Sequence, residues 1–347
     1  MNPVSLIPTP DVLPAAPWVF LALDLLLFAI HILLINMVLG SVLIALFGNI
    51  VKAPEATADR SGKLPSLLAL AINLGVAPLL FMQVIYGHLF YTSSIVMAVY
   101  WLVVIPLLII GYYALYIHAK KYANSPRLSR VALWLAGLIL LYIGAMFVNN
   151  MTLMLQPYKW VYYFASRKGT FLNISDPTFL PRYLHFIGAS VAVGGLFLAY
   201  SKVPHKKGSA GVGLKIFAYA TMVQTLIGMW FLASIPKPFL IQFMGEAPFA
   251  TTMLMIAFAG AIASIGAAFS HHLRSTTLFF FITIAAMVLT RHNLRQMYLS
   301  GKFSFEQLVV KPQYGAMALF FAILVAGTLT VAYMIRLSRT VGERRAG

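Results

Sequence analysis

Four histidines lie within long apolar stretches of this 347-residue chain: His31, His88, His185 and His292. A charged side chain in the middle of a bilayer costs about 2.5 kcal/mol or more, so ionisable residues there are rare and usually functional. A neutral imidazole is a good axial ligand for haem iron. The chain has no cysteine, which excludes disulfides, thiolate ligands, iron-sulfur clusters and thioether-attached haem.

Three arginines stand within one helical turn of two of these histidines. Arg182 precedes His185 by three residues, and Arg291 and Arg295 flank His292. A guanidinium group can bind a carboxylate through two parallel hydrogen bonds, and the propionates of haem are carboxylates. We therefore expect these arginines to bind haem propionates.

A stripe of small residues follows His185. Gly188, Ala192 and Gly195 stand at i+3, i+7 and i+10, which places them on one face of a helix. The missing side-chain volume would suit a flat macrocycle. Small residues also let two membrane helices approach closely, so the stripe alone leaves both interpretations open.

The composition predicts an all-α integral membrane protein. Apolar residues make up 61% of the chain, charged residues 10%, and the mean hydropathy is +0.87, whereas about a quarter of a soluble chain is charged. A crossing takes about 20 apolar residues. We expect nine membrane-spanning helices in one domain over residues 1–347, at roughly 18–50, 64–90, 95–119, 131–152, 179–201, 213–235, 249–269, 275–291 and 314–336.

The distribution of basic residues predicts the orientation. Loops after the first, third, fifth and seventh helices and the C-terminal tail hold 16 of the 25 Lys and Arg residues, among them Lys52, Arg60, Lys202, Lys206 and Lys207. Basic loops stay cytoplasmic, so the N-terminus is expected outside and the C-terminus inside. The net charge of +17 is scattered over short loops, which argues against a nucleic-acid partner.

With this orientation, all four apolar-segment histidines are expected at one depth in the outer half of the membrane. A single membrane histidine more often hydrogen-bonds to a neighbouring helix than binds a metal, but four at one depth favour ligation. The remaining histidines are interpreted as structural, because they fall at inner helix ends or in loops: His118, His205, His271 and His272.

The longest outer segment, about 156–179, carries basic and aromatic residues close together: Lys159, Arg167 and Lys168 with Tyr158, Trp160, Tyr162, Tyr163 and Phe164. This mixture is typical of an interfacial helix. It predicts either an aromatic belt at the bilayer boundary or a docking surface.

The spacing of these residues resembles subunit I of the cytochrome bd quinol oxidases over nearly the whole chain. In that family each of two haem-ligating histidines is followed nine residues later by a glycine, as His31 is by Gly40 and His185 by Gly194. Further matches are Phe197, three residues after the second glycine, and the pair Ile72 and Asn73. The resemblance implies a nine-helix bundle with its N-terminus outside and haems near the outer face.

The resemblance also implies two further ligands. The family's low-spin haem has a methionine ligand in a segment opening with Pro and Phe, which matches Met255, with Met253 as the nearby substitute. The family has a haem-ligating glutamate three residues before an Arg-Gln pair. His292 stands there, three residues before Arg295 and Gln296.

Two departures from the family affect the expected activity. No Asp or Glu occurs between Arg60 and Asn173, although oxygen reduction in the family needs acidic residues on the third helix. The loop that helps to bind quinol in the family is reduced to 237–247, where Lys237 and Glu246 are the candidate residues.

We therefore expect a haem b electron-transfer subunit in the bacterial cytoplasmic (inner) membrane, within a multi-subunit complex. It would exchange electrons between membrane quinol or quinone and a c-type or multihaem cytochrome partner on the outer face. Two or three haems b are expected: one on His185 with Met255, and the rest on His31, His292 and a third candidate, His88. The alternatives are a bd-type terminal oxidase and a haem-free transporter with a histidine proton relay.

Overall fold

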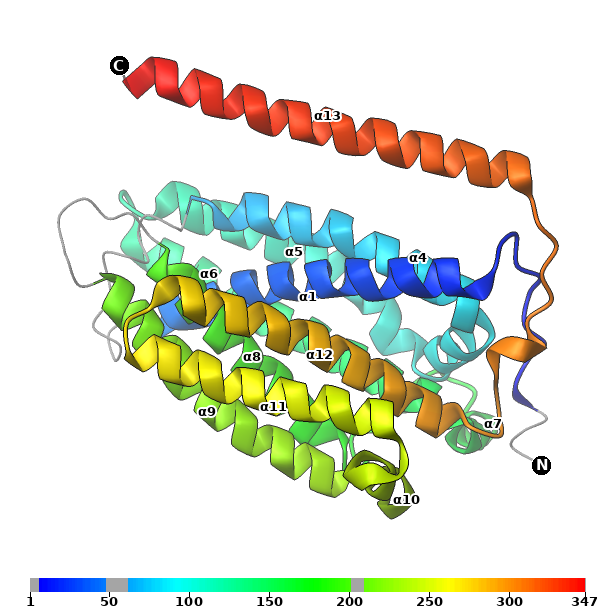
Figure 1. The fold of residues 1–347 in the computed structure, drawn as a ribbon. Coiled ribbons are helices and arrows are strands. Elements are labelled where there is room, and N and C mark those ends of the chain that lie inside the picture. Colours follow the sequence, from blue (N-terminus) through cyan, green and yellow to red (C-terminus); the bar gives the residue numbers. More distant parts are fainter. Residues whose placement is uncertain (1–5, 48–61, 201–208, 347) are drawn as a thin grey trace.

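The computed structural model describes residues 6–47, 62–200 and 209–346, and its regular elements are helices (Figure 1). Nine of the described helices are long and apolar enough to cross a membrane, as predicted: α1 (Pro17–Leu46), α4 (Leu64–Val96), α5 (Ala98–Lys121), α6 (Pro126–Met154), α8 (Phe179–Ala199), α9 (Ser209–Ser234), α11 (Pro248–Phe269), α12 (Leu273–Leu299) and α13 (Tyr314–Ala346). The basic residues Lys52, Arg60, Lys202, Lys206 and Lys207, and also His205, lie outside the described residues.

The short elements gather at the end of the bundle that holds the chain's N-terminus, called here the N-terminal end (Figure 1). They are η2 (Pro157–Val161), α7 (Tyr162–Ala165), α10 (Lys237–Ile241), η3 (Gln242–Glu246) and η4 (Phe305–Gln307). The outer segment about 156–179 is therefore two short helical turns and a loop, not the single interfacial helix that its composition predicted.

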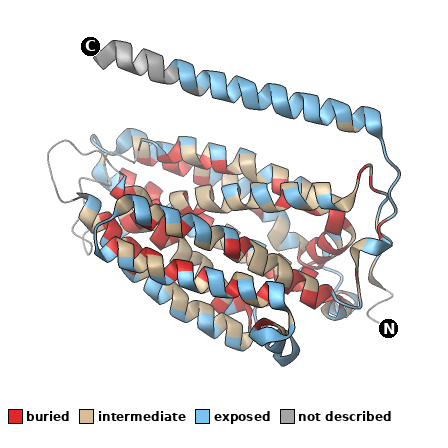
Figure 2. Ribbon diagram, viewed as in Figure 1, coloured by how far each residue is buried: buried red, intermediate tan, exposed pale blue. Residues whose placement is uncertain are grey.

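Helix α1 is the centre of the bundle. It packs against α4 and α6 on one side and against α8 and α12 on the other. The pairs α4–α5 and α5–α6 complete the first half, and α8–α9, α9–α11 and α11–α12 complete the second. Helix α13 lies apart from both halves, on the side of α4, and is exposed along nearly all of its described length (Figures 1 and 2).

The two halves meet where α1 crosses α8. A Cβ atom added to Gly40 would overlap the carbonyl oxygen of Ser190, and one added to Gly194 would lie 2.6 Å from the carbonyl carbon of Gly40. The Ser190 hydroxyl also donates a 2.9 Å hydrogen bond to Oδ1 of Asn36. Close backbone approach and interhelical hydrogen bonds are the main attractions between helices in lipid. The crossing therefore fixes α1 and α8 in one register.

A buried polar network attaches the loop after α7 to the end of α6. Asp176 accepts hydrogen bonds from Nε2 of Gln156 at 2.7 Å and from the backbone N–H of Thr178 at 2.9 Å, and it pairs with Nζ of Lys159 at 3.2 Å. Burial opposes ionisation of this carboxyl. The hydrogen bonds from Thr178 and Gln156 and the charge of Lys159 outweigh that effect and hold the pKa of Asp176 below its usual value.

This network predicts an acid-sensitive loop. A carboxyl whose pKa is lowered by folding stabilises the folded state above its unfolded pKa, about 3.9, and that stabilisation is lost as the pH falls through the folded pKa. We expect Asp176→Asn to lower the free energy of unfolding at pH 7 by about 1–3 kcal/mol. The difference from the wild type should shrink below about pH 4. Thermal unfolding of the purified protein at several pH values measures this.

The matched control is Glu306→Gln, because Glu306 is an exposed acid at the same end of the bundle. It should leave the unfolding temperature unchanged at every pH. Equal destabilisation by Asp176→Asn at pH 3 and at pH 7 would contradict the role assigned to the ionised carboxylate.

Candidate cofactor-binding site

The crossing of α1 and α8 brings His31 and His185 to the same level in the bundle. The two helices run in the same direction, and Asn36 is hydrogen-bonded to Ser190. His31 precedes Asn36 by five residues, and His185 precedes Ser190 by five residues. Because a helix rises by a constant amount per residue, the two imidazoles lie at matching heights on neighbouring helices.

His292 lies close to that level on α12. Nη1 of Arg295 is 3.3 Å from a carboxylate oxygen of Asp24 on α1, which sets the register of these two helices. At about 1.5 Å per residue, His292 lies about 4.5 Å farther from the N-terminal end than Arg295. His31 lies about 10 Å farther from that end than Asp24. Their levels therefore differ by only about 6 Å.

His88 lies elsewhere, so the prediction that all four histidines share one depth is wrong for this residue. Gly75 of α4 faces His31, since a Cβ atom there would be 2.6 Å from Nδ1 of that ring. His88 follows thirteen residues later, about 20 Å nearer the N-terminal end. Its ring packs against Phe303 with 5.1 Å between the centroids. His31 and His88 cannot both bind one iron.

Two of the imidazoles contact a backbone carbonyl of a neighbouring helix through Nδ1, and Nε2 of His185 also lies 3.3 Å from Nε2 of Gln224. Nδ1 of His31 lies 2.9 Å from the carbonyl oxygen of Ala71, and Nδ1 of His185 lies 3.2 Å from that of Gln224. A histidine that binds a metal through Nε2 commonly donates its Nδ1–H to a carbonyl in this way. Nδ1 of His292 is buried and has no hydrogen-bond partner among the described residues.

The three arginines form a buried cationic cluster near these rings. Arg291 interacts electrostatically with both Arg182 and Arg295. Asp24 is the carboxylate that pairs with Arg295, and both side chains are at most 5% exposed. Arg182 lies over the ring of Phe231 at 4.8 Å, and its Nε is buried without a partner among the described residues.

Arg291 is likewise held by an aromatic ring. Its guanidinium lies 4.2 Å from the ring centroid of Phe28, and Nη2 is 3.6 Å from the sulfur of Met151. Three guanidinium charges thus lie near two carboxylates, Asp24 and Asp176, and the second of these also pairs with Lys159. These four cations and two carboxylates leave an excess of two positive charges. Buried charges are normally paired, so the cluster fits a ligand that carries two carboxylates, as haem does.

Arg182 lies about one turn closer to the N-terminal end than His185, and Arg295 about one turn closer than His292, while Arg291 is adjacent to His292 in the sequence. Arg182 and His185 share one face of α8, three residues apart. On α1, Asp24, Phe28 and His31 stand at i, i+4 and i+7, so the ring of His31 continues the face that meets the arginines of α12. His31 and His185 therefore lie in a layer just below the arginines, and His292 lies at the level of the arginines themselves.

Tyr86 belongs to the same cluster, although the sequence did not single it out. Its hydroxyl accepts a 2.7 Å hydrogen bond from Nε2 of Gln296, and Arg295 lies 4.9 Å from its ring centroid. Helix α4 leaves helical geometry at Tyr86, with φ −118° and ψ 18°. Asp24, the acid within an apolar run, was the sequence signal that could have located this network.

The packing of α8 decides between the two interpretations that its small-residue stripe left open. The small-residue stripe of α8 packs against α9, because a Cβ atom on Gly188 would lie 3.3 Å from Cβ of Gln224 and one on Gly195 would lie 2.7 Å from the backbone nitrogen of Phe217. The stripe is thus a helix contact and not free volume for a macrocycle.

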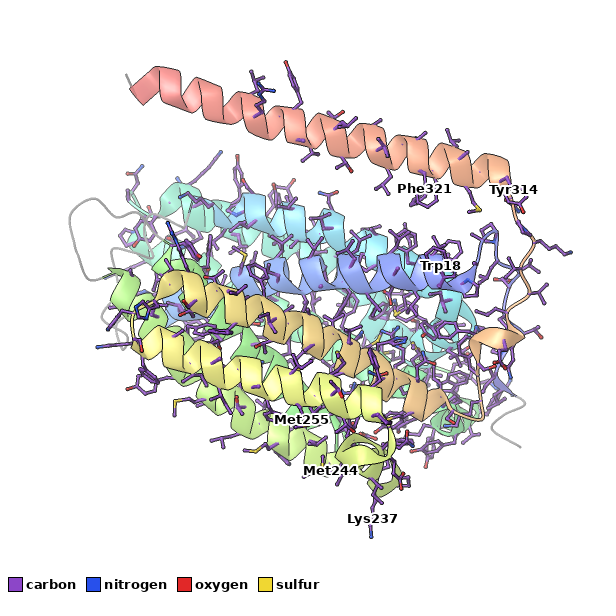
Figure 3. The ribbon with its side chains drawn as sticks, in the orientation of Figure 1. Trp18, Lys237, Met244, Met255, Tyr314 and Phe321 are labelled. Atoms are coloured by element: carbon purple, nitrogen blue, oxygen red, sulfur yellow. The ribbon has the colours of Figure 1, made fainter. Side chains whose placement is uncertain are left out.

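Met255 does not face the interior of the bundle. It is 66% exposed on the outer surface of α11, whereas its neighbour Leu254 is buried (Figure 3). Its predicted pairing with His185 does not fit this packing. Met253 is half-buried and is the better placed of the two methionines.

The candidate quinol residues are also on the surface. Lys237 of α10 and Glu246 of η3 are exposed, and Lys237 projects away from the bundle (Figure 3). Among the described residues, no three His, Asp or Glu side chains come together as a metal site.

Comparison with known protein families, with curated proteins and with solved structures finds no match to this chain.

Proposed function

We propose that the chain is a haem b electron-transfer subunit similar to subunit I of the cytochrome bd quinol oxidases. The observation that supports this most is the arrangement of the cluster: His31 and His185 lie at one level, and beside them lie His292 and three arginines, of which Arg295 pairs with Asp24. Imidazoles suit haem iron, and unpaired buried guanidiniums suit haem propionates.

In this proposal His31, His185 and His292 are the axial ligands, with Met253 as a candidate partner for His185. Arg182 and Arg291 bind propionates, while Arg295 is neutralised by Asp24. His88 is left for a third haem nearer the outer surface. Bound haem would carry single electrons, at a potential set by its axial ligands and burial.

The chain would sit in a bacterial inner membrane with its N-terminal end outside, as the distribution of Lys and Arg predicts. Haems in the outer half would exchange electrons with quinol or quinone in the membrane and with a c-type or multihaem cytochrome on the outer face. Other membrane subunits complete the complex. We favour this over oxygen reduction because α4, α5 and α6 contain no Asp or Glu to carry protons to oxygen.

The test is haem extraction with iron counting on the intact purified complex, beside a reduced-minus-oxidised spectrum. Two or three b haems per chain, with b-type bands alone, are expected. A carbon-monoxide-sensitive chlorin band in the red would favour a terminal oxidase. A colourless preparation would contradict the proposal and favour the haem-free transporter.

The buried ion pair predicts a change of redox potential. Asp24→Asn removes one negative charge about 10 Å from the level of His31, an interaction of roughly 1.7 kcal/mol at an effective dielectric of 20. Loss of negative charge favours the reduced haem. We expect the midpoint potential of one haem to rise by about 59 mV or more, which is tenfold in the equilibrium constant.

A redox titration followed by absorption measures this shift. Asp24→Glu keeps the charge and should keep the potential, and Glu306→Gln removes an exposed carboxylate outside the cluster and should leave all potentials in place. If the Asp24→Asn variant bound haem normally and no midpoint potential changed, this result would argue against a haem beside the cluster.

A further inference from the structure

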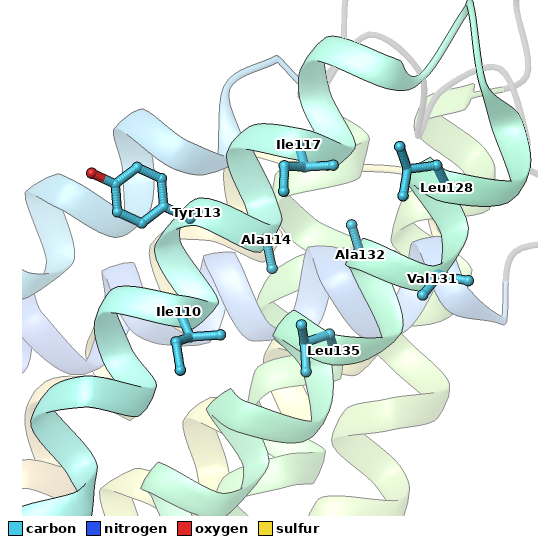
Figure 4. A pocket seen from close by; sticks show the side chains of 8 residues that line it. All are labelled: Ile110, Tyr113, Ala114, Ile117, Leu128, Val131, Ala132 and Leu135. Atoms are coloured by element: carbon cyan, nitrogen blue, oxygen red, sulfur yellow. The ribbon is translucent and has the colours of Figure 1, made fainter.

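An apolar groove of about 300 Å³ lies between α5 and α6, near the end of the bundle opposite the N-terminus (Figure 4). Its sides are large side chains that are more than 40% exposed, and two alanines form its floor: Ile110, Ile117, Leu128, Val131, Ala114 and Ala132. The groove is far from the histidines and arginines of the candidate site and plays no part in the function proposed above.

The groove is a fixed feature of the hairpin formed by α5 and α6. Nδ1 of His118 is 2.8 Å from the hydroxyl of Ser129, and this hydroxyl also lies 3.1 Å from the backbone oxygen of His118. A Cβ atom on Gly111 would lie 3.0 Å from Cγ2 of Ile139. These contacts hold the two helices together at both ends of the groove.

A basic rim borders the groove where the hairpin turns. Lys120 and Lys121 follow Ile117 by three and four residues, and Arg127 precedes Val131 by four, so each continues a face that lines the groove. All three are exposed. The sequence contains no Asp or Glu between Arg60 and Asn173, so no carboxylate on the hairpin neutralises the rim.

We propose that this groove binds an acyl chain of an anionic phospholipid, with the phosphate on the basic rim. The groove is apolar at the depth of lipid chains, and the rim lies where headgroups lie. A Lys or Arg near an anionic membrane surface contributes about fivefold in binding. The charge on the rim therefore selects anionic over zwitterionic lipid, while the groove holds a chain of either.

A partner helix fits the groove less well than a lipid chain. A helix is about 10 Å across, so it would lie on top of the open groove and place only single side chains in it. The groove offers about 300 Å³. A single flexible chain can enter this space and a helix cannot.

The absence of cysteine from the sequence makes a direct test possible. Ile117→Cys places one thiol in the groove, and Ile262→Cys places one on the exposed surface of α11, where Ile262 is 66% exposed. Each is labelled with a bimane fluorophore. The full chain is then reconstituted in vesicles of phosphatidylcholine containing brominated phosphatidylglycerol or brominated phosphatidylcholine, whose bromine atoms quench nearby fluorophores.

At position 117 we expect brominated phosphatidylglycerol to reach half-maximal quenching at about one fifth, or less, of the concentration that brominated phosphatidylcholine needs. At position 262 the two lipids should quench equally. Lys120→Gln, Lys121→Gln and Arg127→Gln together should abolish the preference at position 117. Ala132→Leu, which fills the floor but keeps the rim, should weaken quenching by both lipids there.

Equal quenching by the two lipids at position 117 would overturn the proposal. So would quenching at position 262 with none at position 117, which would mean that protein covers the groove. The readout does not involve haem, so it can fail or succeed whatever the haem content of the same preparation.

Discussion

Replacing His185 by alanine is expected to remove one b haem from the purified protein, so that the haem-to-chain ratio falls by one and the corresponding band disappears. The substitution removes the proposed ligand. The space that the ring leaves lies beside Gly228, because a Cβ atom added to Gly228 would be 3.2 Å from Cε1 of His185. Pyridine haemochrome analysis and iron counting measure the loss. His31→Ala should remove a haem of different spectrum or potential.

The matched control is His118→Ala. This histidine is also buried and hydrogen-bonded to a neighbouring helix, but it lies at the opposite end of the bundle. It should keep every haem, although it removes the same ring. If His185→Ala retained full haem content and an unchanged spectrum, the assignment of this residue would be wrong. Equal haem loss in His118→Ala would instead indicate a general loss of packing.

Gly40→Ala is expected to be the most damaging single-methyl change in the membrane region. The new Cβ would overlap the backbone oxygen of Ser190, and a backbone atom cannot move aside as a flexible side chain can. Overpacking usually costs about 1–3 kcal/mol, and here α1 and α8 must separate. Loss of the monodisperse protein in size-exclusion chromatography, or a large drop in unfolding temperature, would report this.

Gly266→Ala provides the control, because it is the same change within α11 with nothing within 4 Å of the added Cβ. Alanine favours a helix over glycine by about 1 kcal/mol, so this variant should be as stable as the wild type or slightly more so. Equal behaviour of the two variants would show that the crossing tolerates separation. A folded Gly40→Ala protein with altered haem bands would locate the damage at the level of His31 and His185.

The sequence predicted the number and approximate place of the membrane-spanning helices, because about 20 apolar residues in lipid can satisfy their backbone only as a helix. The ends were less predictable. Helix α12 was expected to end near residue 291, yet it continues to Leu299. The residues beyond 291 are too polar to extend the apolar run, but Arg295 and Gln296 find partners in Asp24 and Tyr86 on other helices.

The spacing along α12 puts Arg291 and Arg295 on one face, and the structure brings Arg182 of α8 within electrostatic range of Arg291. The sequence could not predict which face meets a neighbour. Met255 and Leu254 differ by one position and point to different surroundings. The depth of His88 depends on the register between α1 and α4. Contacts between the two helices, such as that of Gly75 with His31, determine this register. The pattern of a single helix does not contain it.

The separate position of α13 means that the other eight long helices hold together without it. The chain reaches α13 through an extended segment beside Leu13, whose backbone N–H donates to Val309 at 2.8 Å and whose oxygen accepts from Lys311 at 2.9 Å. Attraction between helices in lipid comes from direct packing, and α13 packs on the rest mainly through Phe320 and Phe81. Helix α13 is therefore attached to the rest of the protein mainly at its N-terminal end. Moving it outward would break few contacts among the other eight long helices.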